Sequence, residues 1–395
     1  MDLNSGYKQT EMGGIPEDWD VVLFKEQFYI SAGGDAKPEL SSSYQDEVHC
    51  FPIYSNSLTD AGLYGYCSYS DHPAKSITIT ARGTLGVATY RDHEYTAIGR
   101  VLVLEPKRES VGSFFAEYIN SQVEFAIEST GVPQLTAPQI GAYSIVVPPL
   151  PEQTAIAEAL GDVNALLSGL DKLIAKKGDL KQAAMRQLLT GKTRLPGFGG
   201  AWDVRKIGEF TDCTAGGTPS TWNSDYWGGN IRWMNSGELN LRRVHEVEGR
   251  ITIAGLNNSS TKVIPSGCVL IGLAGQGRTR GTVAMNYLEL CTNQSIAAIF
   301  PNSSFSSEYL YQNLDSRYEE LRELSSGGGG RGGLNLTLIK GLEIPFPSIE
   351  EQTAIAEVLF DMDSEVAALE AQRDKTRLLK QGMMQELLTG KTRLI

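Results

Sequence analysis

PLPEQTAIAEALGDV at residues 149–163 returns as PSIEEQTAIAEVLFDM at residues 347–362, with one additional residue before the glutamate. From the glutamate onward the two copies stay 199 residues apart, and both end in LLTGKTRL, at residues 188–195 and 387–394. About forty residues therefore align without a gap. A repeat of this length indicates that the chain is built from two copies of one half.

Each copy predicts one long helix. Pro149 and Pro347 precede the copies, and proline suits the first turn of a helix. Gly191 and Gly390 suit the C-terminal stop. Each helix is expected to extend over about 40 residues, or about 60 Å. Apolar residues alternate at spacings of four and three, as in the seam of a coiled coil: Ile156, Leu160, Val163, Leu167, Leu170 and Ile174, then Ile355, Leu359, Met362, Val366 and Leu369.

A second, weaker repeat opens each half. GGIPEDWDVVLFKEQF at residues 13–28 resembles GFGGAWDVRKIGEF at residues 197–210. Each half therefore consists of a short tryptophan segment, a globular segment of about 130 residues and a long helix. The sequence predicts a mixed α/β fold in which two globular domains are joined by two long antiparallel coiled-coil helices. The arrangement should be pseudo-two-fold and nearly circular, with the chain ends close together.

The two globular segments contain both strands and helices. Their β-branched and aliphatic runs lie between Gly, Pro, Asn and Ser, which is typical of strands. The predicted strands are Ser76–Thr80, Val101–Leu104, Val269–Leu273 and Ile296–Phe300, and the predicted helices are Ser113–Ser129 and Ser306–Leu324.

Composition limits the classes of function. The net charge of −12 argues against a simple DNA-coating protein, because basic domains are the usual mark of nucleic-acid binding. Residues 1–150 carry 9 basic and 19 acidic side chains. DNA binding would therefore need a local basic face, or basic partners that neutralise the phosphates. The five cysteines form no CxxC pair, for which a reducing cytoplasm is the simplest interpretation. No apolar run reaches the roughly 18 residues of a membrane span.

Three blocks of the globular segments are distinctive: FPIYSNSLTDAGLYGYCSY (51–69), GGTPSTWNSDYWGGNIRWMNSGEL (216–239) and RITIAGLNNSSTKVIPSGCVLIGLAGQGRTRGTVA (250–284). Together with the repeated helices, they resemble the specificity subunit of Type I restriction-modification systems. The resemblance covers nearly the whole chain. It implies target-recognition domains at residues 1–148 and 196–346, and conserved helical regions at 149–195 and 347–395.

The resemblance also implies partners. Each globular domain would read one half of a bipartite, asymmetric site on double-stranded DNA, and the helices would set the spacing. The helices, around Gln153, Ile156, Gln352 and Ile355, would bind two modification (adenine methyltransferase) subunits, and restriction or translocase subunits would join them. This subunit would hold no cofactor, since S-adenosylmethionine, ATP and Mg²⁺ are expected in the partner subunits.

Glycine-flanked loops are the candidates for reading DNA. Arginine can read guanine, and glutamine can read adenine, through paired hydrogen bonds. Glycine lets the backbone approach a phosphate closely. The alternative for any single arginine is a hairpin turn with a solvated side chain. The candidate side chains are Arg82 and Gln134 in the first half and Gln276, Arg278, Arg280 and Arg331 in the second.

No catalytic or metal-binding motif is apparent. Gly191-Lys192-Thr193 resembles the end of a phosphate-binding loop, but Arg186 stands where that motif needs glycine. Cys67 and His72 lack a second pair of ligands, so no metal site is predicted. We therefore expect a non-enzymatic specificity subunit. Two alternatives stay open: a coiled-coil scaffold with two ligand-binding lobes that never touch DNA, and a complete DNA-modifying enzyme.

Overall fold

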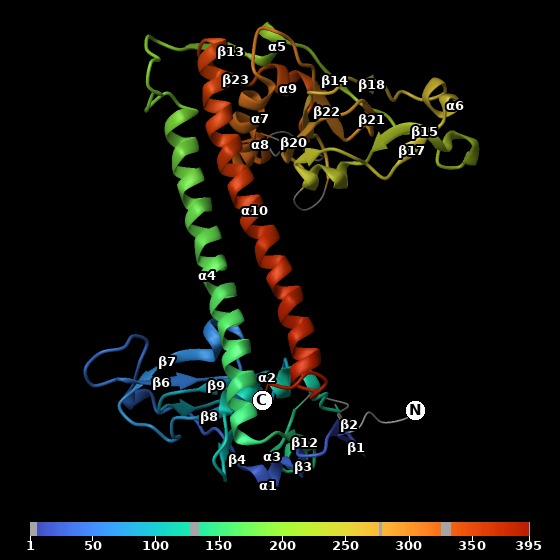
Figure 1. Ribbon diagram of the computed structural model, residues 1–395. Helices are drawn as coiled ribbons and strands as arrows, with labels where there is room; N and C mark the ends of the chain where they lie inside the picture. Colours follow the sequence, from blue (N-terminus) through green and yellow to red (C-terminus); the bar gives the residue numbers. More distant parts are fainter. Residues whose placement is uncertain (1–5, 127–133, 276–278, 325–332, 395) are drawn as a thin grey trace. The chain divides into compact units, whose positions relative to one another are not determined.

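The computed structural model describes residues 6–126, 134–275, 279–324 and 333–394. The chain divides into two compact units: unit 1 is Met1–Asp171 with Ala371–Ile395, and unit 2 is Lys172–Glu370. Both long helices, α4 (Leu150–Leu188) and α10 (Ile349–Leu387), contribute one end to each unit (Figure 1). Each unit therefore combines one globular lobe with the start of one long helix and the end of the other.

Lobe 1, the globular part of unit 1, is built on two four-stranded sheets. The larger has the order β4–β11–β8–β9 and the smaller the order β10–β6–β7–β5. Helix α2 packs against β8 and β9, and its Phe115 meets Phe28 edge to face, with 5.3 Å between the ring centres. The elements are β1 Tyr7–Thr10, β2 Gly13–Pro16, β3 Asp20–Leu23, α1 Phe24–Gln27, β4 Phe28–Ala32, η1 Pro38–Leu40, β5 Ser41–Ser42, β6 Phe51–Tyr54, η2 Thr59–Gly62, β7 Leu63–Cys67, β8 Ser76–Ile79, β9 Ala88–Arg91, β10 Thr96–Ala97, β11 Leu102–Pro106, α2 Gly112–Gln122, α3 Ala137–Gly141 and β12 Ser144–Val147.

Lobe 2, the globular part of unit 2, repeats this plan with one more strand. Its main sheet has the order β14–β22–β19–β20–β16, and its second sheet the order β17–β15–β21–β18. Helix α7 packs on β19 and β20. The elements are β13 Asp203–Lys206, α5 Ile207–Phe210, β14 Cys213–Ala215, η3 Ser224–Tyr226, β15 Trp227–Met234, η4 Ser236–Leu241, β16 Arg243–Val244, β17 Arg250–Ile251, α6 Ile253–Asn257, β18 Val263–Ile264, β19 Val269–Gly272, β20 Val283–Asn286, β21 Leu290–Thr292, β22 Ile296–Ile299, α7 Ser307–Asp315, α8 Tyr318–Leu324, α9 Leu336–Lys340 and β23 Glu343–Phe346.

The predicted strands are all present, as β8, β11, β19 and β22. The helix predicted over Ser113–Ser129 is shorter than expected, with residues 127–129 outside the described residues, and the helix predicted over Ser306–Leu324 is divided. The helix expected over Ser306–Leu324 is two helices, because the amide of Arg317 bonds the carbonyl of Leu314, three residues earlier, and tightens the last turn of α7. Helix α2 ends at Gln122, since Val123 adopts extended backbone (φ −109°, ψ 115°) and packs against the core.

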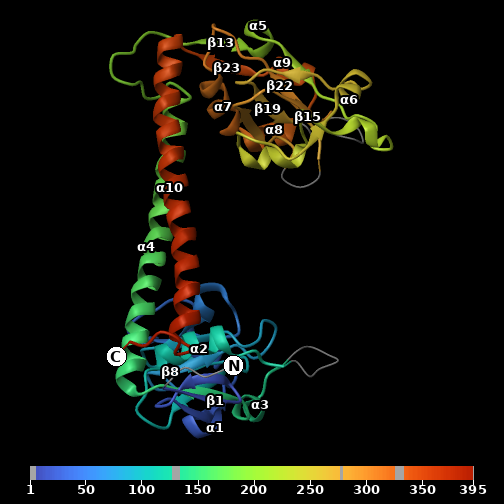
Figure 2. The ribbon, with the colours of Figure 1, turned by 45° about the vertical axis from the view of Figure 1, so that its right-hand side comes forward.

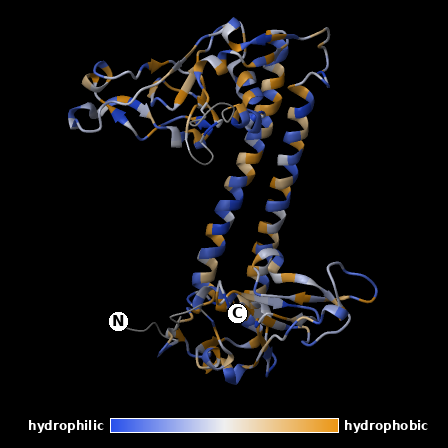
Figure 3. Cartoon of the chain, turned by 180° about the vertical axis from the view of Figure 1, so that it is seen from behind, coloured by the Kyte–Doolittle hydropathy of each residue, from blue (hydrophilic) through white to orange (hydrophobic). Residues whose placement is uncertain are grey.

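Both long helices form as the repeat predicts, with 39 residues each. Their seam residues are fully buried where a helix meets a lobe: Ile156 and Leu160 are 0% exposed in unit 1, and Ile355 and Leu359 are 1% and 0% exposed in unit 2. Figure 3 shows apolar and polar residues alternating along both helices, as expected of helices with one buried stripe.

The two helices are antiparallel within each unit. In unit 2, Lys177 pairs with Glu365 at 2.6 Å, and one turn later Lys181 pairs with Asp363. The residue number therefore rises on α4 as it falls on α10. Figure 1 and Figure 2 show the two helices side by side in unit 1 from two directions.

A buried glutamate joins lobe 1 to the helices. The Trp19 indole N–H donates to Glu152 Oε2 at 2.8 Å, and Arg393 donates from Nε and Nη2 to the two Glu152 oxygens at 2.7 and 2.8 Å. Glu152 is 1% exposed and Trp19 is 0% exposed. The Arg393 guanidinium also donates to Asp18, which lowers the pKa of that carboxyl. The joint thus ties the start of the lobe, the first turn of α4 and the chain segment after α10.

Unit 2 contains the same joint, built from the equivalent residues. Trp202 Nε1 donates to Glu351 Oε2 at 3.0 Å, and Arg194 donates to both Glu351 oxygens at 2.5 Å. Glu351 is also 1% exposed. Because the arginine always comes from the segment that follows the other helix, neither unit is complete without residues distant in the sequence.

The glycines that follow the helices allow the chain to turn and to pack closely against the tryptophan segment of this joint. Gly191 and Gly390 have φ of 68° and 70°, the left-handed conformation that favours glycine. A Cβ at Gly390 would lie 2.6 Å from Pro16 Cδ, and one at Gly191 would lie 3.2 Å from the Trp202 ring. The two chain ends meet here as expected, since the Tyr7 hydroxyl donates to the Gly390 carbonyl at 2.8 Å.

We expect Arg393→Met to lower the free energy of unfolding of the chain by about 3 kcal/mol, because it leaves the buried Glu152 carboxylate without its cation. Urea unfolding measures the loss. Arg377→Met is the matched control, since Arg377 is 54% exposed and its ion pairs contribute about 0–1 kcal/mol. Equal losses from the two substitutions would contradict the importance of the joint.

Candidate nucleic-acid interface

Two candidate DNA-reading residues that are distant in the sequence lie together on lobe 1. Arg82 is in the loop between β8 and β9, and Gln134 precedes α3; the two are paired in an antiparallel β-bridge. The amide of Leu135 donates to the carbonyl of Ala81 at 2.9 Å. Both Arg82 and Gln134 are exposed, whereas Ala81 and Leu135 are buried. The backbone is therefore anchored while the two polar side chains face solvent.

A second contact holds the same loop from the other side. The Ala81 amide donates to Asn56 Oδ1 at 2.8 Å. The segment with Gln134 is fixed by Thr136, whose hydroxyl caps α3 by accepting from the Gln139 amide. A loop fixed at both edges presents its side chains with little loss of conformational entropy on binding.

Lobe 2 contains the same loop pair at the equivalent position. The Leu334 amide donates to the Leu273 carbonyl at 3.0 Å, just as Leu135 bonds Ala81. Asn335 then caps α9 by accepting from the Leu338 amide at 2.9 Å, in the place of Thr136. Each lobe thus brings a strand-end loop and a capped short helix to the same edge.

Of the candidate DNA-binding residues in the second half, only Arg280 lies within the described residues. Gln276, Arg278 and Arg331 lie outside the described residues. Arg280 is half-buried and takes part in interactions within the chain. That Arg82, Gln134, Gln276, Arg278, Arg280 and Arg331 contact DNA stays a prediction.

The helix residues that were expected to bind partners lie inside the units. Gln153 is 3% exposed, Gln352 is 0% exposed, and Ile156 and Ile355 belong to the lobe cores. Gln153 accepts from the amide before α2 and donates to the Pro148 carbonyl, and Gln352 makes the equivalent pair of bonds. These four side chains therefore fix lobe to helix. A partner would meet other, exposed positions of the same helices.

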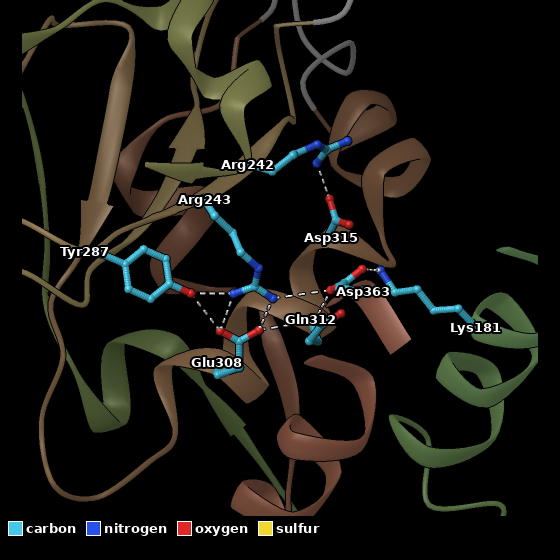
Figure 4. Close-up of polar contacts among 8 residues, drawn as sticks. All are labelled: Lys181, Arg242, Arg243, Tyr287, Glu308, Gln312, Asp315 and Asp363. Carbon is cyan, nitrogen blue, oxygen red and sulfur yellow. Dashed lines mark hydrogen bonds and ion pairs between the residues drawn. The ribbon is translucent and has the colours of Figure 1, made fainter. Parts of the chain in front are cut away.

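A charged network fixes lobe 2 to α10 (Figure 4). Arg243 on β16 donates to both oxygens of Glu308 on α7, at 2.8 and 2.6 Å, and lies 3.3 Å from Asp363 on α10. Its guanidinium also lies 4.6 Å from the centre of the Phe360 ring. Burial alone would lower the pKa of Arg243, but the bonds to Glu308 outweigh it and raise that pKa. Sheet, lobe helix and long helix are thus joined through one cation.

A three-residue contact recurs in both units with its acid and amide exchanged. In unit 1, Glu117 on α2 accepts from Asn164 on α4 at 2.7 Å and pairs with Lys380 at 2.9 Å. In unit 2, the amide belongs to the lobe, because Gln312 on α7 donates to Asp363 on α10 at 2.8 Å. Lys181 then pairs with Asp363. Each contact keeps one acid, one amide and one lysine, although acid and amide have changed places.

Neither the Trp–Glu–Arg joints nor the contacts of Glu117 and Gln312 were identified from the sequence. Glu152, Arg194, Glu351 and Arg393 lie in the repeat at constant separation, so their recurrence was a usable signal. Glu117 and Gln312 lie in segments that align poorly, and only the fold places them opposite the helices.

Within the described ranges, no group of three or more His, Cys, Asp or Glu side chains could hold a metal ion. Among the described helices, none combines the length and apolar character that crossing a bilayer requires.

Comparison with known proteins assigns the family. The model of the family described as Type I restriction modification DNA specificity domain matches residues 16–176 and again residues 200–377. The chain belongs to this family. It is 22% identical to the putative type I restriction enzyme MjaX specificity subunit of Methanocaldococcus jannaschii, over 98% of this chain and 97% of that relative. It is 35% identical to the MjaIX specificity subunit of the same organism, over 41% of this chain and 38% of that relative.

A solved structure shares the fold. The Type-I restriction-modification system S subunit from M. genitalium aligns over 98% of both chains with a TM-score of 0.68 and 14% identity. The predicted mixed fold, with two globular domains and two long helices, is confirmed.

Because the acid and the amide are exchanged between the two units, a second substitution in unit 1 should compensate for the loss of Glu117. Glu117→Gln should lower the free energy of unfolding by about 1–2 kcal/mol, because Lys380 loses its partner. Adding Asn164→Asp rebuilds the arrangement of unit 2 and should recover at least half of the loss. Urea unfolding of the two single variants and the double variant gives the coupling energy. Glu47→Gln, an exposed carboxylate of the same lobe, is the control. Additive losses would contradict the exchange.

Proposed function

We propose that this chain is the DNA sequence-specificity subunit of a Type I restriction-modification complex, and that it performs no chemistry itself. Each lobe reads one half of a bipartite, asymmetric site on double-stranded DNA, and the long helices set the spacer. The observation that carries the proposal is the duplicated loop pair, at Ala81–Leu135 in lobe 1 and Leu273–Leu334 in lobe 2, in a chain that matches the specificity-domain family once in each half.

The shared scaffold of the two lobes and their different loops suit two domains that read DNA independently. The two lobes share the joint to the helices and the position of the loop pair, but their loops differ in sequence: ARGTLGVATY in lobe 1 and LAGQGRTRGTVAMN in lobe 2. Sequence is read by side chains at base edges, whereas position is set by the scaffold. Two unlike loops on one frame are what an asymmetric site needs.

The acidic charge of the first half favours shared DNA binding. With 19 acidic and 9 basic side chains in residues 1–150, lobe 1 gains little from phosphate neutralisation by itself. We propose that two adenine-methylating modification subunits supply much of that cation charge, along with S-adenosylmethionine, and that restriction subunits supply ATP-driven translocation with Mg²⁺.

The exposed faces of the long helices are the proposed docking surface for modification subunits. In unit 2, Leu173 and Leu180 on α4 lie seven residues apart and are 39% and 47% exposed. Leucines at heptad spacing on a helix surface can pack against a helix of another chain.

We expect Arg82→Ala to weaken binding of cognate DNA by the assembled complex about 10- to 100-fold, the range of one lost bidentate base contact. Methylation should fall at sites with the base pair that Arg82 reads, and Arg82→Lys should restore salt-dependent binding but not base preference. Arg108→Ala, at another exposed arginine of lobe 1, is the control. Unchanged affinity and base preference would remove Arg82 from the interface.

Replacing residues 203–346 with the corresponding segment of another family member should change one half of the methylated motif and leave the other half and the spacer unchanged. Long-read mapping of methylated adenines in cells that carry the modification subunits reads both halves. A change in both halves would contradict independent lobes.

The same cells test the proposal as a whole. Deleting the gene should abolish methylation at the bipartite motif. Methyl transfer by the purified chain without partners would show instead a complete modifying enzyme, and failure of the complex to select any DNA sequence would favour a scaffold.

A further inference from the structure

Arg91 is a buried cation without a buried acid beside it. It lies on β9 of lobe 1 and is 5% exposed. Its Nε donates to Thr78 Oγ1 at 3.0 Å, its Nη2 donates to the Ala61 carbonyl at 2.7 Å, and its guanidinium lies 3.5 Å from the centre of the Tyr54 ring. All these partners are neutral. Among the ion pairs of the described residues, none includes Arg91.

A small cavity adjoins this guanidinium. Its volume is about 60 Å³, and it lies between the loop after β6 and the faces of β8 and β9. Polar side chains around Arg91 line much of it: Ser55, Ser57, Thr78, Thr80 and Thr89. A water molecule needs roughly 10–15 Å³ of such space, so the cavity has room for a halide-sized ion.

Three hydroxyl groups of this cavity can donate inward, whereas those of Ser55 and Thr78 donate to the carbonyls of Gly62 and Thr89. Thr80 Oγ1 already accepts from the Val87 amide at 3.0 Å, and Ser57 Oγ accepts from the Thr59 amide at 3.1 Å. Their own hydrogens are therefore free to point at an acceptor. Thr89 Oγ1 makes no hydrogen bond with another described residue, so its hydrogen is also available.

The second lobe shows that the frame does not need this charge. The carbonyls of Ala81 and Leu273 occupy equivalent positions, because each accepts the amide of the segment before the short helix. With these two residues aligned, the strand pair β8–β9 matches the pair β19–β20, and Asn286 lies where lobe 1 has Arg91. The same alignment places apolar Leu270 and Ala284 where lobe 1 has Thr78 and Thr89. Both are 0% exposed in the core of lobe 2. Lobe 1 therefore has a cation where lobe 2 has a neutral amide, and hydroxyls where lobe 2 has packed apolar groups.

We propose that this cavity of lobe 1 binds a small monovalent inorganic anion of halide size, with Arg91 as its counter-charge and the hydroxyls of Ser57, Thr80 and Thr89 as its donors. A buried charge is expensive to maintain unless an opposite charge accompanies it. Burial lowers the pKa of Arg91, which is consistent with the lack of a nearby carboxylate, although an arginine stays protonated in any such site. Water could fill the space but would leave the charge uncompensated.

The ion would stabilise the loop that holds the Arg82 hairpin. The loop after β6 is closed by the Ser55 amide, which bonds the Gly62 carbonyl at 2.8 Å, and it supplies Asn56, which accepts from Ala81. Arg91 holds the same loop through Ala61. The bound anion would therefore stabilise the loop after β6, which in turn holds the backbone beside Arg82 through Asn56 and Ala81. The proposal itself does not depend on DNA binding.

Thermal unfolding of the full chain tests the proposal. Sodium chloride or bromide should raise the unfolding midpoint by roughly 2 °C over sodium gluconate at equal ionic strength, because gluconate is too large for the cavity. A shift of this size corresponds to about a tenfold excess of ligand over its dissociation constant. Thr89→Val removes one donor at nearly constant volume and should reduce the difference by at least half. Arg91→Gln should abolish it, and Arg108→Gln, at an exposed arginine, should leave it unchanged.

Crystals grown in bromide give a direct answer even if Arg91→Gln fails to fold. An anomalous peak within about 3.5 Å of the Arg91 guanidinium is the expected result. Equal midpoints in halide and gluconate together with no peak in the cavity would show that it holds water only, and would overturn the proposal.

Discussion

A buried glutamate in the first turn of each long helix holds the lobe and the two helices of each unit together. A carboxylate suits the positive end of a helix, but a buried one must be matched by a cation and hydrogen-bond donors. Glu152 and Glu351 receive both from a tryptophan that opens the lobe and an arginine that follows the opposite helix. This interaction connects the first turn of each long helix to the start of its lobe and to the segment that follows the other helix.

The exchanged acid and amide show how such a frame tolerates divergence. Glu117 with Asn164, and Gln312 with Asp363, satisfy the same lysine position with the same total charge. A lobe can therefore change its surface loops freely, but its side chains that face the helix must change together with that helix. The loops of the two lobes differ, whereas the contacts that hold each lobe to the helices recur in both halves of the chain.

The periodic and repeated parts of the fold could be predicted from sequence, and the parts that depend on tertiary contacts could not. The seam at Ile156 and Leu160 and the stop at Gly191 follow from local spacing and backbone preference. The interior position of Gln153 was missed, because a polar residue in an amphipathic repeat predicts an exposed face until its partners in the lobe are known. The pairing of Arg82 with Gln134 depends on a β-bridge across 52 residues, which no local pattern indicates.

The discontinuity of unit 1 has a consequence for biosynthesis. Unit 2 is one uninterrupted stretch, Lys172–Glu370, so the ribosome delivers all of it before translation ends. The lobe that is made first lacks the cation of its central carboxylate until Arg393, which follows α10, has been synthesised. All residues of unit 2 are therefore synthesised before the residues of unit 1 are complete, although lobe 1 comes first in the sequence.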